Sequence, residues 1–507
     1  MTEELKKQIQ EFREKTEQFA KGEISVKDYK GFSGKYGSYA QRGASAGMLR
    51  LRIAGGQLDL EKLKAIIDIC EKYDIERLHC TTCQTIQLHN LPLDKIADIM
   101  SDAIESGFYT LGGGGDFPRN VMVSPLTGVE ENENFDVSPY AKKAAEYLIS
   151  QIDKVKMPRK LKVCFSNSPS NAVHATFRDM GFVSRPDGGF DVYCAGGMGL
   201  NPRMGVQVAE NIDASKILYY IKAMISLFCD YGNYENRSKA RTRYLQETLG
   251  DKFISEYNFR LEKALDEGGL DIDAPSKEIT KSGKEGEVSS RRVIAQKQKG
   301  LYAVKCHFKG GNVTPQILRD IYNAIKGMEE VSIRLSPDET MYIINCDIDE
   351  ANCVLDATKS AAQSDIEESV ACIGASICQQ GLRDSQELLG DILREVQKYD
   401  FPSDALPKLH ISGCMSSCGT HQIGSIGFHG KVKMVDKKPV PGFTVSINGC
   451  DEQGRERFGD DIGVIAADDI PAFLVELGKS VTEAGMSYKE FSDKKSDELM
   501  SIIKKYI

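Results

Sequence analysis

A block of sequence occurs twice in this chain, and the repeat limits the folds that it can adopt. The segment LRIAGGQLDLEKL, from Leu51, matches CHFKGGNVTPQIL, from Cys306, with both double glycines aligned. At the same offset of 255 residues, CQTIQLHN matches DETMYIIN. A weaker similarity links KVCFSNSPSNAVH, from Lys162, with LHISGCMSSCGTH, from Leu409. The repeat predicts a duplicated chain, in which each half is a small α+β module followed by a larger one.

The first copy also predicts its own secondary structure. MLRLRI alternates apolar and charged residues as a strand does, and Gly55-Gly56 makes the turn that follows. Apolar residues then recur at helical spacing, with Asp59 as the N-cap. We expect one strand over LHCTTCQTIQLHN, from Leu78, and a second helix over residues 94–107.

Two cysteine pairs predict a metal centre in the second half only. Cys372 and Cys378 have five residues between them, and Cys414 and Cys418 have three. Four thiolates can hold a [4Fe–4S] cube, which takes one sulfur per iron. The run KLHISGC predicts a strand that delivers the second pair into a turn. The glycines that follow, Gly419 and Gly424, allow close backbone approach.

A zinc site, disulfides and a radical-enzyme cluster fit these cysteines less well. Zinc pairs are usually two to four residues apart, and the first pair here is wider. Disulfides need an oxidising compartment, whereas the start MTEELKKQIQEFREK has no apolar core and resembles neither a signal nor a transit peptide. A radical enzyme that uses S-adenosylmethionine would need a third cysteine soon after Cys418, where His421 and Gln422 stand. The spacing favours an iron–sulfur cluster.

The length, net charge and cysteine content limit the kinds of protein that this chain can be. A chain of 507 residues should form two to four domains. Its net charge of −9 argues against bulk nucleic-acid binding, and no apolar stretch approaches the ~18 residues of a membrane span. Fourteen cysteines are best explained as metal ligands and buried thiols. We therefore expect a cytoplasmic protein with no membrane or nucleic-acid partner.

The pattern C-x5-C followed some 35 residues later by C-x3-C resembles the sirohaem-dependent sulfite and nitrite reductases. The resemblance runs from about Lys35 to about Lys479. In that family the last cysteine also bridges the cluster to the sirohaem iron, a role that maps onto Cys418. The family often has proline after the third cysteine, where this chain has Met415; this changes the turn but removes no ligand.

The resemblance implies a mixed α/β, α+β fold, the internally duplicated nitrite/sulfite reductase fold. Paired ferredoxin-like half-domains form one domain, and two larger α/β domains clasp the sirohaem. The expected boundaries are a helical extension, a half-domain, a first sirohaem-binding domain, a linker, a second half-domain and a cluster-bearing domain, at residues 1–40, 41–115, 116–265, 266–300, 301–365 and 366–507.

Basic residues should complete the site, because sirohaem is a polycarboxylate and its substrates are small anions. Four positions match the family's anion-binding residues, which the resemblance implies are catalytic: Arg50, Arg119, Lys160 and Lys162. Period-2 alternation puts both lysines on one face of a strand. Each residue alone is also consistent with an ordinary solvated strand face.

Further cofactor contacts follow from the same resemblance. Arg52 shares a strand face with Arg50, and ENRSKARTRY, with Arg237 and Arg241, matches a family segment, although a solvated helix face explains that run equally well. His79 and Cys83 stand where arginines usually help to hold the carboxylates, so this network is thinned or rebuilt here.

Cys80 and Cys83 form a C-x2-C motif. Such a motif can be a thiol pair, two ligands of a metal ion or two inert strand cysteines. We favour inert strand cysteines, because no second pair lies nearby in the sequence.

The sequence shows no flavin or NADPH module. LGGGGDF and CAGGMGLN lack the G-x-G-x-x-G spacing with a following acidic residue that a dinucleotide site needs. Electrons must therefore come from a separate carrier, such as ferredoxin or a partner subunit.

The sequence thus predicts six-electron reduction of sulfite to sulfide at a sirohaem coupled to a [4Fe–4S] cluster. Nitrite reduction to ammonia by the same machinery is the alternative. A cluster-only electron-transfer subunit and a sirohaem-binding protein without turnover also stay open, because of the departures at His79 and Cys83.

Overall fold

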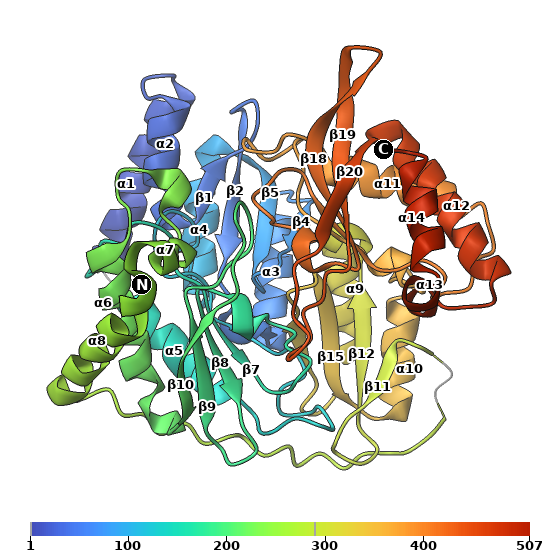
Figure 1. Ribbon diagram of the computed structural model, residues 1–507. Coiled ribbons are helices and arrows are strands. Elements are labelled where there is room, and N and C mark those ends of the chain that lie inside the picture. The colour runs from blue at the N-terminus through green and yellow to red at the C-terminus, as the bar shows by residue number, and fades with distance from the viewer. Residues whose placement is uncertain (1–2, 288–289) are drawn as a thin grey trace.

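The computed structural model describes residues 3–287 and 290–507 (Figure 1). The chain begins with α1 (Glu3–Ala20) and α2 (Val26–Ser33). Phe12 of α1 is fully buried, and its ring centroid lies 5.1 Å from that of Tyr36. The N-terminal extension is therefore helical, and it is packed against the module that follows.

Two five-stranded antiparallel sheets occupy the small modules. The first has the order β1-β2-β5-β4-β13 and the second the order β11-β12-β15-β14-β3. The strands of the first half are β1 (Ser38–Ala40), β2 (Ala46–Leu51), β3 (Gln57–Leu58), β4 (Leu78–Cys80) and β5 (Ile86–Pro92). Those of the second half are β11 (Val293–Ala295), β12 (Tyr302–His307), β13 (Asn312–Val313), β14 (Ser332–Leu335) and β15 (Thr340–Cys346).

The two halves exchange one edge strand, which joins the small modules into one domain. β3 pairs with β14, and β13 pairs with β4. Both exchanged strands follow a double glycine with left-handed backbone: φ is 66° at Gly56 and 70° at Gly311. A Cβ at Gly56 would lie 2.7 Å from Leu335 O, and one at Gly311 2.7 Å from Cys80 O. The repeated glycines therefore mark the crossings, and one apolar core spans both halves.

The helices of the small modules are also duplicated. They are α3 (Leu60–Lys72), α4 (Ile96–Glu105), α9 (Pro315–Ile325) and α10 (Ile348–Ala357). The predicted cap is confirmed, because Lys62 N donates to Asp59 Oδ1 at 2.8 Å. Thr314 caps α9 in the same way, accepting from Ile317 N at 3.3 Å.

Each larger module is a five-stranded sheet with helices against it. The sheets have the orders β6-β7-β8-β9-β10 and β16-β17-β18-β19-β20, with two parallel pairings followed by two antiparallel pairings in each. The first comprises β6 (Met122–Val123), β7 (Val163–Ser166), β8 (Met180–Ser184), β9 (Phe190–Cys194), β10 (Val206–Ile212), α5 (Ser138–Ser150), α6 (Ile217–Tyr231), α7 (Leu245–Leu249) and α8 (Phe253–Glu267). The second comprises β16 (Val370–Ala371), β17 (Leu409–Ser412), β18 (Ile426–Val435), β19 (Lys438–Ile447), β20 (Asp460–Ala466), α11 (Ser385–Val396), α12 (Ile470–Glu483), α13 (Tyr488–Lys494) and α14 (Ser496–Lys504).

The structure corrects three details of the expected layout. LHCTTCQTIQLHN forms two antiparallel strands, β4 and β5, and Cys83 lies in the turn between them. β11 lies inside the segment expected to be a linker and pairs with β12. In the larger modules Val163 pairs with Met180 as Leu409 pairs with Ile426, an offset of 246, one less than the sequence alignment. A turn or an edge strand leaves little periodic signal in so few residues.

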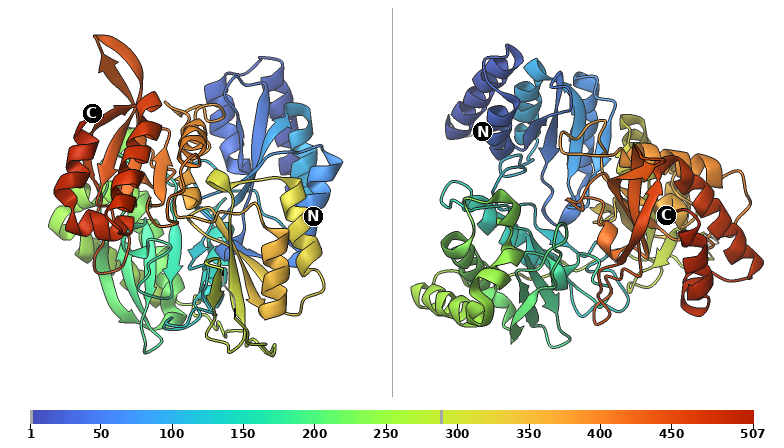
Figure 2. Two further views of the ribbon diagram at one scale, coloured as in Figure 1. Left: turned by 90° about the vertical axis from the view of Figure 1, so that its right-hand side faces the viewer. Right: turned by 45° about the horizontal axis from the view of Figure 1, so that its top comes forward.

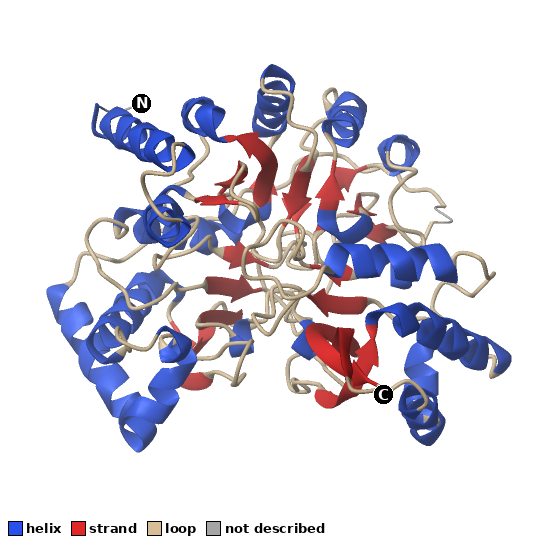
Figure 3. Ribbon diagram, turned by 90° about the horizontal axis from the view of Figure 1, so that it is seen from above, coloured by secondary structure: helices blue, strands red, loops and turns tan. Residues whose placement is uncertain are grey.

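The four sheets surround a centre filled by loops, with most helices on the outside (Figure 3). Two further views show the same grouping, with the N-terminal and C-terminal helices on different flanks (Figure 2). Across residues 3–287 and 290–507, no helix has the length and apolar character to cross a membrane.

Candidate cluster and anion site

Parallel strand pairing brings the two cysteine pairs together. β16 ends immediately before Cys372, and β17 ends two residues before Cys414. The two strands are parallel neighbours, with Val370 opposite His410. Their carboxyl ends therefore meet at one edge of the sheet, where Gly413 N donates to Cys372 Sγ at 3.2 Å.

The loop after Cys414 is folded tightly onto this edge. Ser417 and Thr420 have left-handed backbone, with φ of 52° and 53°. A Cβ at Gly419 would lie 2.0 Å from Ile411 O, and one at Gly424 2.8 Å from Ile426 O. The predicted close approach at both glycines is confirmed, and it turns the chain so that Cys418 faces the other cysteines.

The four cysteine thiols are close enough to affect one another's pKa values. Burial raises the pKa of Cys418, and Cys378 and Cys414 add to this rise although Lys160 opposes it. Burial and Cys418 raise the pKa of Cys372 to about 12. Among the described residues, no three Cys, His, Asp or Glu side chains are placed to hold a single metal ion. A cube takes one sulfur per iron, so its ligands stand farther apart than ligands around one ion, and this donor set fits a [4Fe–4S] cluster.

Cations gather beside Cys418. Arg119 N donates to Leu161 O at 2.8 Å, so the backbone at Arg119 runs beside the segment that carries Lys160 and Lys162. Burial lowers the pKa of Lys160 well below its usual value, and Arg241, Lys162 and Arg119 lower it further, whereas Cys418 raises it. The structure brings Arg119, Lys160 and Lys162 together, and their catalytic role stays a prediction.

Arg241 pairs with Asp179, but among the described residues no carboxylate pairs with Arg119, Lys160 or Lys162. Arg119 Nε and Arg241 Nε are buried without a hydrogen-bond partner. Burial lowers the pKa of Arg119 to about 10, because the guanidinium loses water. Unpaired buried cations are costly, and a bound polyanion removes that cost. The residues present therefore fit a carboxylate-rich cofactor and a small anionic substrate.

The glycine-rich run orients two of the arginines. Arg119 donates to Gly113 O at 2.7 Å and to Gly115 O at 2.8 Å, and Arg50 also donates to Gly113 O. A Cβ at Gly113 would lie 2.8 Å from Thr110 O. The backbone carbonyls of this run therefore hold the side chains of Arg50 and Arg119 in place. This role explains why the run is rich in glycine without a bound nucleotide.

Asp179, which sequence reasoning missed, organises the lysine side of the site. Its side chain is buried and accepts from Arg241 Nη2 at 2.9 and 3.0 Å, from Lys162 N at 2.9 Å and from the Thr242 hydroxyl. Burial alone raises the pKa of this carboxyl, but Arg241 and Thr242 outweigh it and lower the pKa. No local pattern marks Asp179, because its partners are distant in sequence.

Cys83 lies among the same cations, and Cys80 does not. Burial alone raises the pKa of Cys83, yet Lys162, Arg178 and Arg50 together lower it to about 6. Burial raises the pKa of Cys80 beyond its usual value. Cys80 is therefore a buried strand thiol, whereas the sulfur of Cys83 stands where a cation was expected from the resemblance.

Three predicted cofactor contacts have protein partners in the structure. Arg52 donates to Leu111 O at 2.8 Å, to Pro118 O at 3.2 Å and to Arg119 O at 2.8 Å. His79 Nε2 lies 3.6 Å from Glu339 Oε1, and burial lowers the pKa of His79 to about 3. Arg237 is exposed and pairs with Asp116 at 2.7 and 3.0 Å. Their role as cofactor contacts stays a prediction.

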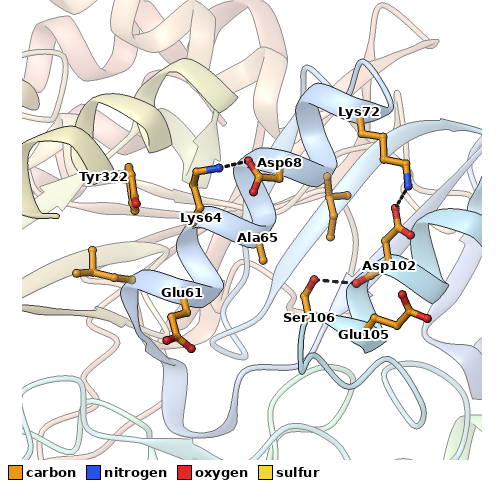
Figure 4. Close-up of a pocket in the computed structure, with 11 residues that line it drawn as sticks. Glu61, Lys64, Ala65, Asp68, Lys72, Asp102, Glu105, Ser106 and Tyr322 are labelled. Atoms are coloured by element: carbon orange, nitrogen blue, oxygen red, sulfur yellow. Dashed lines mark hydrogen bonds and ion pairs between the residues drawn. The ribbon is translucent and has the colours of Figure 1, made fainter. Parts of the chain in front are cut away.

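Two surface pockets lie away from these residues. One, of about 590 Å³, lies over α3 and α4 beside Tyr322 (Figure 4). Its two lysines are already paired, Lys64 with Asp68 and Lys72 with Asp102 at 2.7 Å. The other, of about 640 Å³, is lined by residues such as Asp187 and Asp273. Neither contains a cluster cysteine or a cation of the candidate site.

Comparison with known proteins agrees with this geometry. A family model described as "Nitrite/Sulfite reductase ferredoxin-like half domain" matches residues 39–106. A second, "Nitrite and sulphite reductase 4Fe-4S domain", matches residues 114–265. Both family models that match the chain therefore describe parts of nitrite and sulfite reductases. The second match covers the copy of the larger module without the cysteine pairs, and the cysteine-bearing copy has the same strand order.

The similar proteins include both sulfite reductases and nitrite reductases. "Sulfite reductase [ferredoxin] 1" of Mycolicibacterium paratuberculosis is 26% identical over 417 residues, 79% of this chain and 73% of the relative. "Ferredoxin--nitrite reductase, chloroplastic" of Arabidopsis thaliana is 23% identical over 418 residues, 79% of this chain and 70% of the relative. The solved structure of the Mycobacterium tuberculosis NirA protein has the same fold, with a TM-score of 0.74, 24% identity and coverage of 89% of this chain and 87% of that one.

Proposed function

We propose that this chain is a sulfite reductase, which reduces sulfite to sulfide with six electrons from a separate carrier such as ferredoxin. Nitrite reduction to ammonia is the second candidate, because a relative named for nitrite is 23% identical over the same share of the chain as one named for sulfite at 26%. The proposal places the enzyme in the cytoplasm, where its fourteen free cysteines stay reduced.

The observation that carries the proposal is the position of Lys160 beside Cys418, next to Arg119 and Lys162, three cations with no carboxylate partner among the described residues. When bound, the [4Fe–4S] cluster and the sirohaem would relay electrons from the carrier, and the sirohaem would supply an iron for the substrate. Cys372, Cys378, Cys414 and Cys418 would hold the cluster, and Cys418 would also be the residue that it shares with the sirohaem.

The chain's own residues bind and neutralise the anion. Lys160 and Lys162 lie on the segment beside Arg119, so these three basic side chains would face the oxygens of a bound substrate. A low-dielectric setting strengthens their attraction to an anion. Lysine ammonium groups can also donate protons as oxygen leaves as water. Arg50 and Arg119 are held by the glycine-run carbonyls, so they need not reorganise when the anion binds.

An absorption spectrum followed by dye-driven assays tests the proposal. The purified protein should show a Soret-type band with a red charge-transfer feature, and reduced methyl viologen should drive both sulfite and nitrite reduction, with the higher kcat/KM for sulfite. A broad brown shoulder without a Soret band would indicate a cluster-only subunit. A haem spectrum without turnover of either anion would indicate a binding protein.

A further inference from the structure

Arg178 is a buried arginine that has no carboxylate partner among the described residues. It is 4% exposed. Its Nε donates to Val173 O at 3.0 Å, and its Nη2 donates to His174 Nδ1 at 2.8 Å. A buried guanidinium that has only neutral partners is costly unless an anion reaches it.

A buried histidine connects Arg178 to the other half of the chain. An arginine can only donate, so His174 Nδ1 accepts and His174 Nε2 carries the ring proton. His174 Nε2 donates to Asp451 Oδ2 at 3.1 Å, and Asn171 Nδ2 donates to Asp451 O at 2.8 Å. Burial and the charge of Arg178 lower the pKa of His174, which agrees with a neutral ring. The row of hydrogen bonds from Asp451 through His174 therefore fixes the direction of the Arg178 guanidinium.

The Arg178 guanidinium belongs to the group of cations around Cys83. Val173, whose carbonyl holds Arg178, is part of the small apolar cluster against which Cys83 packs. Burial raises the pKa of Cys83, but Lys162, Arg178 and Arg50 together lower it to about 6, so three positive charges act on one sulfur. One thiolate balances one of these charges. The described residues leave the other two without a negative partner.

A carboxylate suits the position beside Arg178. Sirohaem is a polycarboxylate, and a planar guanidinium can bind a carboxylate through two parallel hydrogen bonds. Because Val173 O and His174 already hold the Arg178 side chain, little rotamer freedom is lost when an anion binds.

We propose that Arg178 binds a carboxylate of the sirohaem beside Cys83, and that His174 and Asp451 are positioning residues that aim its guanidinium. The inference rests on the proposed function. The turn at Cys83 has no basic side chain, and the segment before β8 then supplies one. Asp451, from the second half of the chain, thereby contributes to cofactor binding through side chains of the first half.

The test follows sirohaem retention as well as turnover. Arg178→Gln removes the charge but keeps a group that donates hydrogen bonds, and Arg178→Lys keeps the charge without the fork. Cys83→Arg/Arg178→Gln returns a guanidinium to the same place from the turn at Cys83. Arg292→Gln is the matched control, because Arg292 is 2% exposed and donates to Lys305 O and Thr358 O, both at 2.9 Å, in the second small module.

Sirohaem per chain is measured by extraction from the purified holoenzyme, and its release is followed by the Soret band in urea too dilute to unfold any variant. Arg178→Gln should release sirohaem about tenfold faster than wild type, because a hydrogen bond between two charged groups is strong. Arg178→Lys should be intermediate, and the double variant should restore most of the retention. Arg292→Gln should lower Tm but release sirohaem at the wild-type rate.

Two variants of Asp451 test the positioning role. Asp451→Asn keeps an oxygen that accepts from His174, whereas Asp451→Ala removes it. Asp451→Ala should speed sirohaem release, and Asp451→Asn should restore the wild-type rate. Equal release rates in the two variants would remove the positioning role of Asp451.

Wild-type retention in Arg178→Gln would overturn the proposal, and so would a loss that the double variant does not reverse. Should Arg178→Gln not fold, the double variant and Arg178→Lys decide in the same way. Intact retention with a raised KM for sulfite would assign Arg178 to the substrate and would equally overturn it. A wild type that binds sirohaem but reduces neither anion would refute the proposed function alone, because retention is still measured. A wild type that binds no sirohaem would refute both.

Discussion

Replacing Asp179 with asparagine should destabilise the first larger module and disorganise the lysine side of the site. Asparagine keeps the shape of the side chain but leaves Arg241 beside a neutral amide. The Arg241 side chain is 18% exposed and that of Asp179 is fully buried. Breaking a buried pair costs about 3–5 kcal/mol, and the partial exposure of Arg241 puts the expected loss at about 3 kcal/mol.

That loss is measurable as a shift in thermal unfolding. For a domain of 150–250 residues, each kcal/mol lowers Tm by about 2–4 °C, so Asp179→Asn should lower it by about 6–12 °C. Asp230→Asn is the matched control, because Asp230 also binds an arginine, Arg260, at 2.8 Å, but its side chain is 53% exposed. A surface pair contributes about 0–1 kcal/mol. Equal Tm losses in the two variants would refute a structural role for the buried pair.

The difference between wild type and Asp179→Asn should depend on pH. The pKa of Asp179 is lowered in the folded protein, so its contribution is present above the unfolded value of about 3.9 and is lost as pH falls through the folded pKa. The Tm gap should therefore be constant near neutral pH and should narrow in acid. A gap that widens below pH 4 would contradict the assignment. Weaker sirohaem retention should accompany the loss of stability, measured as the ratio of Soret to protein absorbance.

Three further predictions concern the site itself. Serine at any of the first three cluster cysteines should abolish the iron–sulfur signal in electron paramagnetic resonance, because a hydroxyl is a poor iron ligand here; Cys418→Ser should also release or uncouple the haem, and an unchanged spectrum would rule out its bridging role. Cys83→Arg should leave sirohaem content unchanged or raise it, since it restores a cation beside the cofactor carboxylates; a marked loss of cofactor, measured by extraction, would show that the thiol itself packs or binds. Lys162→Asn should reduce kcat/KM more for sulfite than for nitrite, because sulfite is partly a dianion near neutral pH; equal losses on both anions would make Lys162 a general anion holder.

The sequence by itself determined the duplicated plan of this protein. Double glycines, helix caps and alternating strands are set by neighbouring residues, so they can be recognised without a partner in view. The same holds for the cysteine pairs, whose spacing within each turn is local. The left-handed backbone at Gly56 and Gly311 shows why the repeated glycines were informative, since other residues adopt it at a cost.

Only the tertiary structure decided how these parts meet. The exchange of β3 and β13 joins residues some 250 positions apart, and short edge strands carry little periodic signal. The pair of Asp179 with Arg241, and the placement of Cys83 among Lys162, Arg178 and Arg50, depend on segments that are adjacent only after folding. Charge and burial are properties of that assembled environment, which is why the sequence predicted Cys83 to be an inert strand thiol and the structure places it in a turn beside the cations.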